Sequence, residues 1–144
     1  MQRWVPEGAA PIEEHGGFRL IRAGSAGERW GAYEHVLGIS GATVGARGLS
    51  MDIQTIPPGA QSPPHIHAGF EVALYILSGR IIHRYGARLE HSFEAGPGDF
   101  LYVLPDYPHQ SLNPSDTEPV VLVVARTTSD GHAGNVVVEI ETEE

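Results

Sequence analysis

The sequence predicts an all-β domain, and three features of its composition and patterning indicate this. It contains 18 glycines and 11 prolines in 144 residues, well above the usual share of about 12% for these two residue types together. Short apolar segments follow one another at intervals too brief for crossover helices, so their strands should pair antiparallel. Apolar and polar residues alternate within several segments. These observations predict an antiparallel sandwich or barrel.

The length fits one domain covering residues 1–144, enough to bury roughly 70% of the surface that the unfolded chain would expose. Within it we expect an N-terminal arm with edge strands at 1–48, a core that carries the motifs at 49–126, and a C-terminal strand with an acidic tail at 127–144. In the arm, residues 18–22 read as a short strand, and residues 30–39 as an edge strand or irregular structure.

The predicted core begins with a strand at 49–56, in which Leu49, Met51, Ile53 and Thr55 form a mainly apolar face. The apolar segment 72–77 reads as a strand buried on both faces. Ser78-Gly79 is expected to turn it into a hairpin partner at 80–85. Further strands are predicted at 89–95, 100–104, 120–125 and 136–140, and Pro97-Gly98 indicates a type II turn.

Charge and cysteine content exclude several classes of function. The net charge of −9 argues against nucleic-acid and anionic membrane partners, which both need clustered Lys and Arg. With no cysteine, a transition-metal site would have to be built from imidazole and carboxylate ligands. The first residues lack the apolar stretch of a secretory signal, so we expect a cytoplasmic protein.

Four candidate metal ligands stand in a spacing that strands can bring together. His65 and His67 project from the same face of an extended segment, and Glu71 shares their parity if the strand continues. Gly69 could introduce a bulge that changes this parity. His109 would complete the set. Three imidazoles and one carboxylate suit one divalent ion of Fe, Mn, Zn, Ni or Cu and leave one or two positions open.

Two segments around these residues resemble the two motifs of the cupin family. In the first, Gly59 precedes His65-x-His67, Glu71 and Gly79; in the second, Gly98 precedes His109 and Asn113. Leu104 and Asp106 stand where proline and glycine are usual in the second motif, and Asp tolerates the left-handed conformation that such a glycine would adopt.

The resemblance implies a jelly-roll β-barrel, also called a double-stranded β-helix, with a metal ion held by the four residues and frequent homodimers. It also implies a small-molecule ligand or substrate. We expect a metalloenzyme, with dioxygenase or oxidoreductase activity first and isomerase or decarboxylase activity next. The alternatives are a non-catalytic binding or sensing protein whose metal is structural or orients a ligand, and a metal-free binding protein.

Other polar residues are weaker candidates. His83 lies on a predicted strand and could face the cavity, and we consider Tyr75, Tyr102 and Gln54 as further catalytic or pocket-lining residues. Asn113 and Gln110 are expected to hold the loop that carries His109. Three remaining histidines lie in loop-like or edge surroundings and are expected to be exposed; these are His15, His35 and His91.

Overall fold

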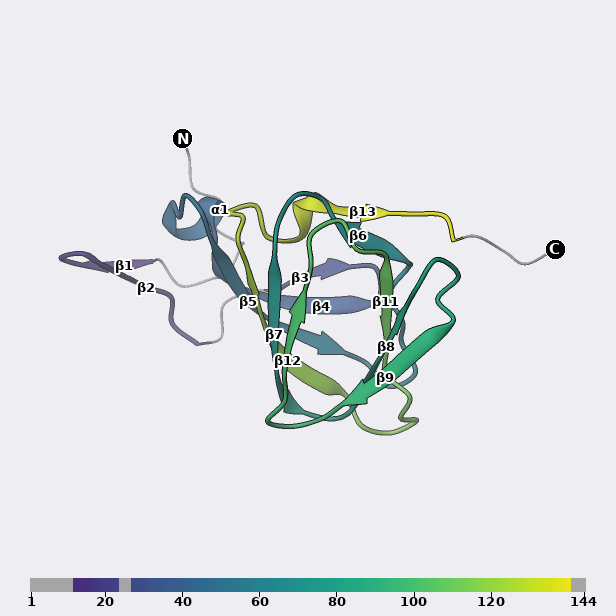
Figure 1. The fold of residues 1–144 in the computed structure, drawn as a ribbon. Coiled ribbons are helices and arrows are strands. Elements are labelled where there is room, and N and C mark those ends of the chain that lie inside the picture. The colour runs from purple at the N-terminus through teal and green to yellow at the C-terminus, as the bar shows by residue number, and fades with distance from the viewer. Residues whose placement is uncertain (1–11, 24–26, 141–144) are drawn as a thin grey trace.

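The computed structural model describes residues 12–23 and 27–140, whose strands form two facing antiparallel sheets and a separate hairpin (Figure 1). One sheet has the order β10-β7-β12-β5-β4-β3, the other β13-β6-β11-β8-β9, and β1 pairs with β2. The all-β prediction is confirmed. None of the helices in these residues is long and apolar enough to span a membrane.

The elements in chain order are β1 (Glu13–His15), β2 (Phe18–Leu20), β3 (Gly27–Trp30), β4 (Tyr33–Ile39), α1 (Gly41–Val44), β5 (Ser50–Ile56), β6 (His65–His67), β7 (Val72–Ser78), β8 (Ile81–Tyr85), β9 (His91–Ala95), β10 (Phe100–Val103), β11 (His109–Leu112), β12 (Val120–Arg126), the 3-10 helix η1 (Gly131–Gly134) and β13 (Asn135–Val137). Residues 1–11 and 24–26 of the expected N-terminal region and residues 141–144 of the acidic tail lie outside the described residues.

The apolar core lies between the two sheets. On β12, Val120, Leu122 and Val124 point inward, as the two-residue period of a strand requires. The neighbouring β7 contributes Val72, Leu74 and Ile76 in the same way, and Ile81 of β8 packs with them from the other sheet. The strand β7 is therefore buried on one face only, and the prediction that both faces are buried was wrong: Ala73 and Leu77 are exposed.

The alternation of β5 was predicted correctly, but its mainly apolar face does not lie inside. Ser50, Asp52 and Ile56 are buried, whereas Met51 on the apolar face is 45% exposed. The reason lies in the neighbouring strand β12, whose inward-facing Arg126 forms an ion pair with Asp52. A buried guanidinium needs such a partner, and this requirement outweighs the burial of Met51.

The predicted hairpin between 72–77 and 80–85 does not form. Although Gly79 turns the chain, β7 pairs with β10 and β12, while β8 pairs with β9 and β11 in the opposite sheet. Gly79 has φ +80°, and a Cβ there would lie 2.4 Å from the carbonyl oxygen of Pro119. Only glycine fits this position, where the chain crosses from one sheet to the other.

Asn113 directly follows β11, the strand that carries His109, and connects the ends of several strands. Its Nδ2 donates to the carbonyl oxygens of Ile56 at 3.1 Å and Glu118 at 2.8 Å, and its Oδ1 accepts from the amide of Ser115 at 3.0 Å. The side chain is fully buried. Asn113 thus holds together the end of β5, the end of β11 and the start of β12. These bonds lie at the loop that follows β11, and not at the loop before His109 that Asn113 was expected to hold.

We predict that Asn113→Ala lowers the free energy of unfolding by about 2–4 kcal/mol, because it leaves buried carbonyl groups without donors. Urea denaturation followed by circular dichroism measures this loss. The matched control is Asp116→Ala, an exposed residue in the same loop, for which the change should stay within about 0.5 kcal/mol. Equal effects of the two substitutions would contradict the structural role of Asn113.

Candidate metal centre

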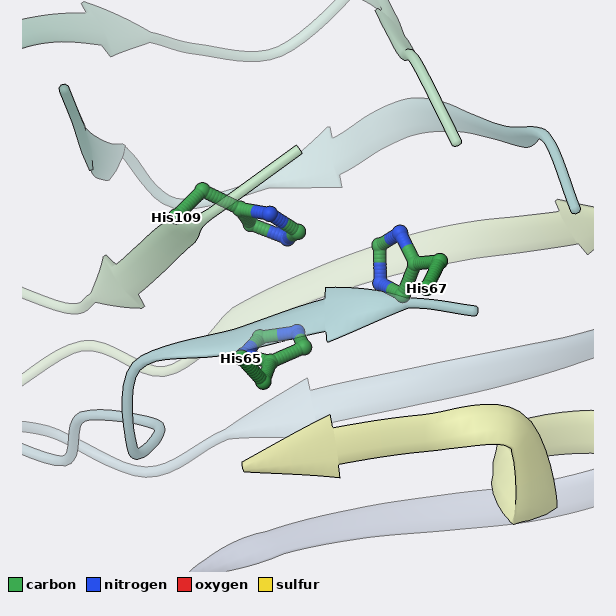
Figure 2. Close-up of side chains that lie close together, drawn as sticks. All are labelled: His65, His67 and His109. Carbon is green, nitrogen blue, oxygen red and sulfur yellow. The ribbon is translucent and has the colours of Figure 1, made fainter. Parts of the chain in front are cut away.

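Three histidines form a cluster in the space between the sheets. His65 and His67 come from β6, and His109, which pairs in register with His65, comes from β11. One candidate ligand nitrogen on each ring lies within 4.8 Å of those on the other two. Figure 2 shows the three side chains close together. All three are buried, and their spacing suits a single ion bound by all of them.

Hydrogen bonds to the backbone set two of the rings in a form that can bind a metal. Nδ1 of His65 donates to the carbonyl oxygen of Pro63, and Nδ1 of His109 donates to that of Tyr107, both at 2.8 Å. Since a carbonyl oxygen only accepts, the proton lies on Nδ1 and Nε2 keeps its lone pair. Nδ1 of His67 is buried without a hydrogen-bond partner among the described residues. These donor groups fit a divalent transition-metal ion.

The cluster is neutral near pH 7. Burial, followed by the charge of His109, lowers the pKa of His65 to about 4. Burial and the charges of the neighbouring histidines lower the pKa of His67 to about 2. Burial also lowers the pKa of His109. Because metal binding requires unprotonated imidazole, the protein holds these ligands ready to bind.

Glu71 does not reach the cluster, and the expected ligand set has to be corrected at this position. Its side chain is exposed, and its carboxylate accepts a hydrogen bond from the hydroxyl of Tyr102 at 2.6 Å. Gly69 adopts φ +80° between β6 and β7, and the alternation changes parity there. As a result Val72, only 3% exposed, faces inward and lines the cavity beside the histidines.

The loop before β11 is tied to the strand that carries the other two histidines. The amide of Asp106 donates to the carbonyl oxygen of His67 at 2.9 Å, and the carboxylate of Asp106 accepts from the amide of Gly69 at 3.1 Å. Asp106 has φ +59°, so it adopts the left-handed conformation for which its residue type is suited. These contacts fix the position of His109 relative to His67.

A cavity of about 40 Å³ adjoins the cluster. Its lining combines apolar and polar side chains from both sheets. They are Trp30, Tyr33, Gln54, His65, His67, Val72, Leu74, Ile81, His83, Val103, His109, Ser111, Val124, Arg126 and Asn135. The edge of the Trp30 ring packs against His65 with 4.8 Å between ring centroids, which helps to hold that imidazole in place.

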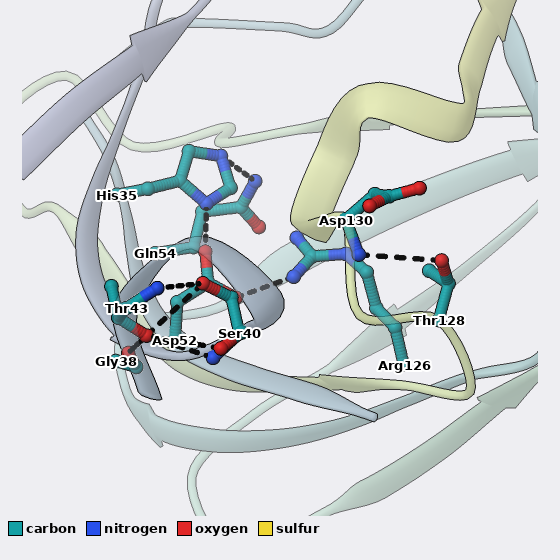
Figure 3. Close-up of polar contacts among 9 residues, drawn as sticks. All are labelled: His35, Gly38, Ser40, Thr43, Asp52, Gln54, Arg126, Thr128 and Asp130. Atoms are coloured by element: carbon teal, nitrogen blue, oxygen red, sulfur yellow. Dashed lines mark hydrogen bonds and ion pairs between the residues drawn. The ribbon is translucent and has the colours of Figure 1, made fainter. Parts of the chain in front are cut away.

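One wall of this cavity carries a buried polar network (Figure 3). Nη1 of Arg126 donates to Asp52 at 2.6 Å, Nδ1 of His35 donates to the other carboxylate oxygen at 2.5 Å, and Nε2 of Gln54 donates to Nε2 of His35 at 3.2 Å. Burial raises the pKa of Asp52, but His35 and Arg126 outweigh it, and the pKa is lowered. Asp52 therefore stays ionised, and its negative charge balances that of Arg126, which would be unfavourable if it were buried without a partner.

The residues considered as weaker candidates for catalysis or for lining the pocket lie in different surroundings. Gln54 and His83 line the cavity, whereas Tyr75 lies on the outer face of β7 with its ring 4.7 Å from that of Phe100. Tyr102 bonds Glu71 near the outer surface. His15 and His91 are exposed as predicted, but the prediction for His35 was wrong, because this residue is 1% exposed and bonded to Asp52.

Sequence reasoning missed Arg126 and Asp52 as components of the site. A usable signal was present for Arg126: it follows an apolar strand and shares the parity of the buried Val120, Leu122 and Val124. An arginine at an inward position of a strand requires a buried acid on a neighbouring strand. Asp52 was the acid available in the alternating segment 49–56.

Comparisons with known proteins agree with this architecture. The family model described as the cupin domain matches residues 52–126, and curated proteins give no significant sequence match. The polyketide cyclase RemF from Streptomyces resistomycificus superposes with a TM-score of 0.67 at 20% identity, covering 85% of this chain and 87% of the cyclase. Together with the structures that follow, it shows that the fold is the double-stranded β-helix.

Two further solved structures are similar. A protein with a double-stranded β-helix domain from Klebsiella pneumoniae has a TM-score of 0.62 at 17% identity and covers 78% of this chain and 89% of its own. The oxalate decarboxylase from Lactobacillus farciminis, solved as a formate complex, has a TM-score of 0.65 at 18% identity. That match covers 78% of this chain but only 33% of the decarboxylase.

We predict that the metal-free protein loses stability as the pH falls from about 6.5 toward 4. The unfolded chain takes up protons on these histidines below their ordinary pKa of about 6.5, while the folded chain, with lowered pKa values, does not. Each buried histidine contributes a loss of up to about 1.4 kcal/mol per pH unit in this range. Urea denaturation of metal-stripped protein at pH 7, 6 and 5 measures it.

The substitution His67→Gln should flatten this dependence, whereas His91→Gln, at an exposed position, should leave it unchanged. A free energy of unfolding that stays constant between pH 7 and pH 5 would show that the buried imidazoles are not held neutral.

Proposed function

The chain belongs to the cupin family, and from the geometry of its cluster we propose that it binds one divalent transition-metal ion through His65, His67 and His109 and acts as a metal-dependent enzyme on a small organic molecule. The observation that carries the proposal is the convergence of three buried imidazoles within 4.8 Å. Two of them are oriented by backbone carbonyl groups. A solely structural role for the histidines would not require three such rings to face one another.

The ligand set determines which chemistry the site favours. Three imidazoles are neutral, so a bound divalent ion would keep its full charge and polarise a carbonyl, enolate or phenolate oxygen as a Lewis acid. Iron oxygenases commonly use two histidines and one carboxylate, but Glu71 points away here and Val72 occupies the inward position. We therefore place Lewis-acid reactions such as isomerisation or decarboxylation ahead of oxidation by dioxygen.

The residues of the cavity wall support this proposal. Arg126 and Gln54 are held by Asp52 and His35, so they present fixed donors to a polar group inside the cavity. A fixed donor stabilises developing negative charge on oxygen without reorganising. His83 also lines the cavity, and its Nδ1 is buried without a partner in the described part of the chain. It is the candidate for holding or accepting a proton next to the substrate.

Oxidation by dioxygen is the second candidate function. It is favoured by the number of protein ligands, because three imidazoles leave up to three positions on a six-coordinate ion. That is sufficient for a substrate bound through two oxygens together with dioxygen. Oxygen consumption by the iron-loaded protein, set against anaerobic turnover by the zinc-loaded protein, separates this activity from Lewis-acid catalysis.

We also propose that two copies of the chain associate through the outer face of the six-stranded sheet. Met51 of β5, Leu77 of β7 and Phe100 of β10 are exposed there, and a groove of about 370 Å³ beside Met51 is lined by Val36, Ile39 and other residues. Residues 19–23 line the other side of this groove. An exposed apolar face can pack against the same face of a second copy across a twofold axis. The cytoplasmic location expected from the sequence stays a prediction.

For the metal site, we predict that His67→Ala and His109→Ala each weaken Zn²⁺ affinity at least about 100-fold, because each removes one of three direct ligands. Isothermal titration calorimetry of metal-stripped protein measures the change. Glu71→Gln and His91→Ala are the controls and should alter the Kd by less than about twofold. If the wild-type protein binds neither Zn²⁺ nor Fe²⁺, Mn²⁺, Ni²⁺ or Cu²⁺ stoichiometrically, the proposed function fails.

For the association of subunits, we predict that Met51→Asp converts a dimer into a monomer, because the interface would bury an unpaired carboxylate. Sedimentation equilibrium measures the molecular mass. The matched control is Val137→Asp, an exposed apolar residue on β13 of the other sheet. A wild-type protein that sediments at the mass of one chain would rule out this dimer.

A further inference from the structure

A second, larger pocket opens at the side of the sandwich where the edge strands of the two sheets, β9 and β10, face each other. Its volume is about 270 Å³. Its walls consist mainly of Tyr85 and Phe93 from the five-stranded sheet, Leu101 and Val103 from the six-stranded sheet, and Leu104 and Tyr107 from the loop before β11. We call it the outer pocket.

The outer pocket reaches the histidine cluster. His83, Val103 and His109 line both this pocket and the inner cavity. His109 is one of the three ligands assigned above, so a molecule in the outer pocket would have its inner end beside the metal ion. His83, only 6% exposed, has an Nδ1 with no partner in the described part of the chain. The inner end of the pocket therefore lies beside a histidine that still has an unsatisfied polar atom.

Aromatic rings form a continuous wall along the five-stranded sheet. The ring of His83 stacks on Phe93 with 5.6 Å between centroids and 15° between planes. The Tyr85 ring lies 6.1 Å from Phe93 and 6.4 Å from Tyr107. The outer rings are not covered by other parts of the described chain, since Phe93 and Tyr107 are 44% and 38% exposed. Such a wall offers flat surfaces on which another ring can stack.

The volume of the outer pocket and the charges along its lining limit the class of ligand that it can bind. An apolar cavity of about 150 Å³ is known to hold benzene, so the outer pocket has room for one or two fused rings. Among the described residues, Arg84 is the only cationic side chain along the lining of the outer pocket apart from the histidines, and it is exposed. A small dianion such as oxalate would leave most of the outer pocket unfilled, and no buried Lys or Arg among the described residues lines this pocket.

We propose that the outer pocket binds the flat aromatic body of the substrate, one or two rings in size, with a hydroxyl or carbonyl oxygen directed at the histidine cluster. This inference rests on the proposed metal-dependent function and names its substrate class. Phenols and naphthols have the required shape and carry their oxygen at the edge of the ring. Aliphatic acids have no ring, and sugar rings are neither flat nor aromatic, so neither offers a π-face to this wall.

The test is a titration of zinc-loaded and metal-free protein with 2-naphthol, followed by ligand fluorescence and by calorimetry. We expect saturable binding of one molecule per chain, tighter in the zinc-loaded protein. Phe93→Ala should weaken binding about threefold to tenfold, in keeping with the loss of one aromatic contact. The matched control is Phe18→Ala, which removes an exposed ring on β2 and should leave the Kd unchanged.

Tyr107→Leu serves as a second variant, and circular dichroism with zinc stoichiometry checks that each variant is folded. If zinc binds to wild-type protein but 2-naphthol does not, the substrate class is overturned and the proposed function stands. If decahydro-2-naphthol binds as tightly as 2-naphthol, stacking on the wall is likewise overturned. If 2-naphthol binds in a Phe93-dependent way but no metal binds, the pocket exists and the proposed function fails.

Discussion

The alternation of side chains along the strands is the constraint on which the rest of the structure depends. With a period of two residues, every second side chain enters the space between the sheets. On β12 this carries Arg126 inside together with three apolar residues, and on β6 it carries both histidines inside. A change of parity at Gly69 brings Val72 inward and leaves Glu71 outside. Core and site are therefore built by the same rule.

Burying Arg126 obliges the neighbouring strands to supply acceptors. Asp52 on β5 accepts from Arg126, and His35 on β4 donates to the other oxygen of the same carboxylate. As a consequence Met51 of β5 turns to the outer surface. The burial of Arg126 and Asp52 thus creates both a polar wall of the cavity and an apolar outer face of the sheet. A buried pair of this kind adds little to stability, which indicates that its value lies in the donors it holds beside the histidines.

Much of this could be predicted from the sequence, because short apolar segments, tight turns and the spacing of His65, His67 and His109 are local signals. Three predictions failed where a distant partner decided the outcome. The inward face of β5 depends on Arg126, more than seventy residues away, and His35 is buried by Asp52. The segments 72–77 and 80–85 separate into two sheets because β7 pairs with β12. Whether the side chain of Glu71 faces the histidines depends on the backbone conformation of Gly69. The periodicity of the sequence alone could not predict that conformation.

In the proposed site, three imidazoles and no protein carboxylate would bind the metal ion. X-ray absorption spectroscopy of the zinc-loaded protein tests this most directly, because it counts the imidazole ligands around the ion. We expect three imidazole nitrogens at about 2.0–2.1 Å from the zinc ion, with the remaining ligand supplied by solvent, and the same spectrum for Glu71→Gln. A shell with two imidazoles, or a spectrum that changes when Glu71 is replaced, would contradict it.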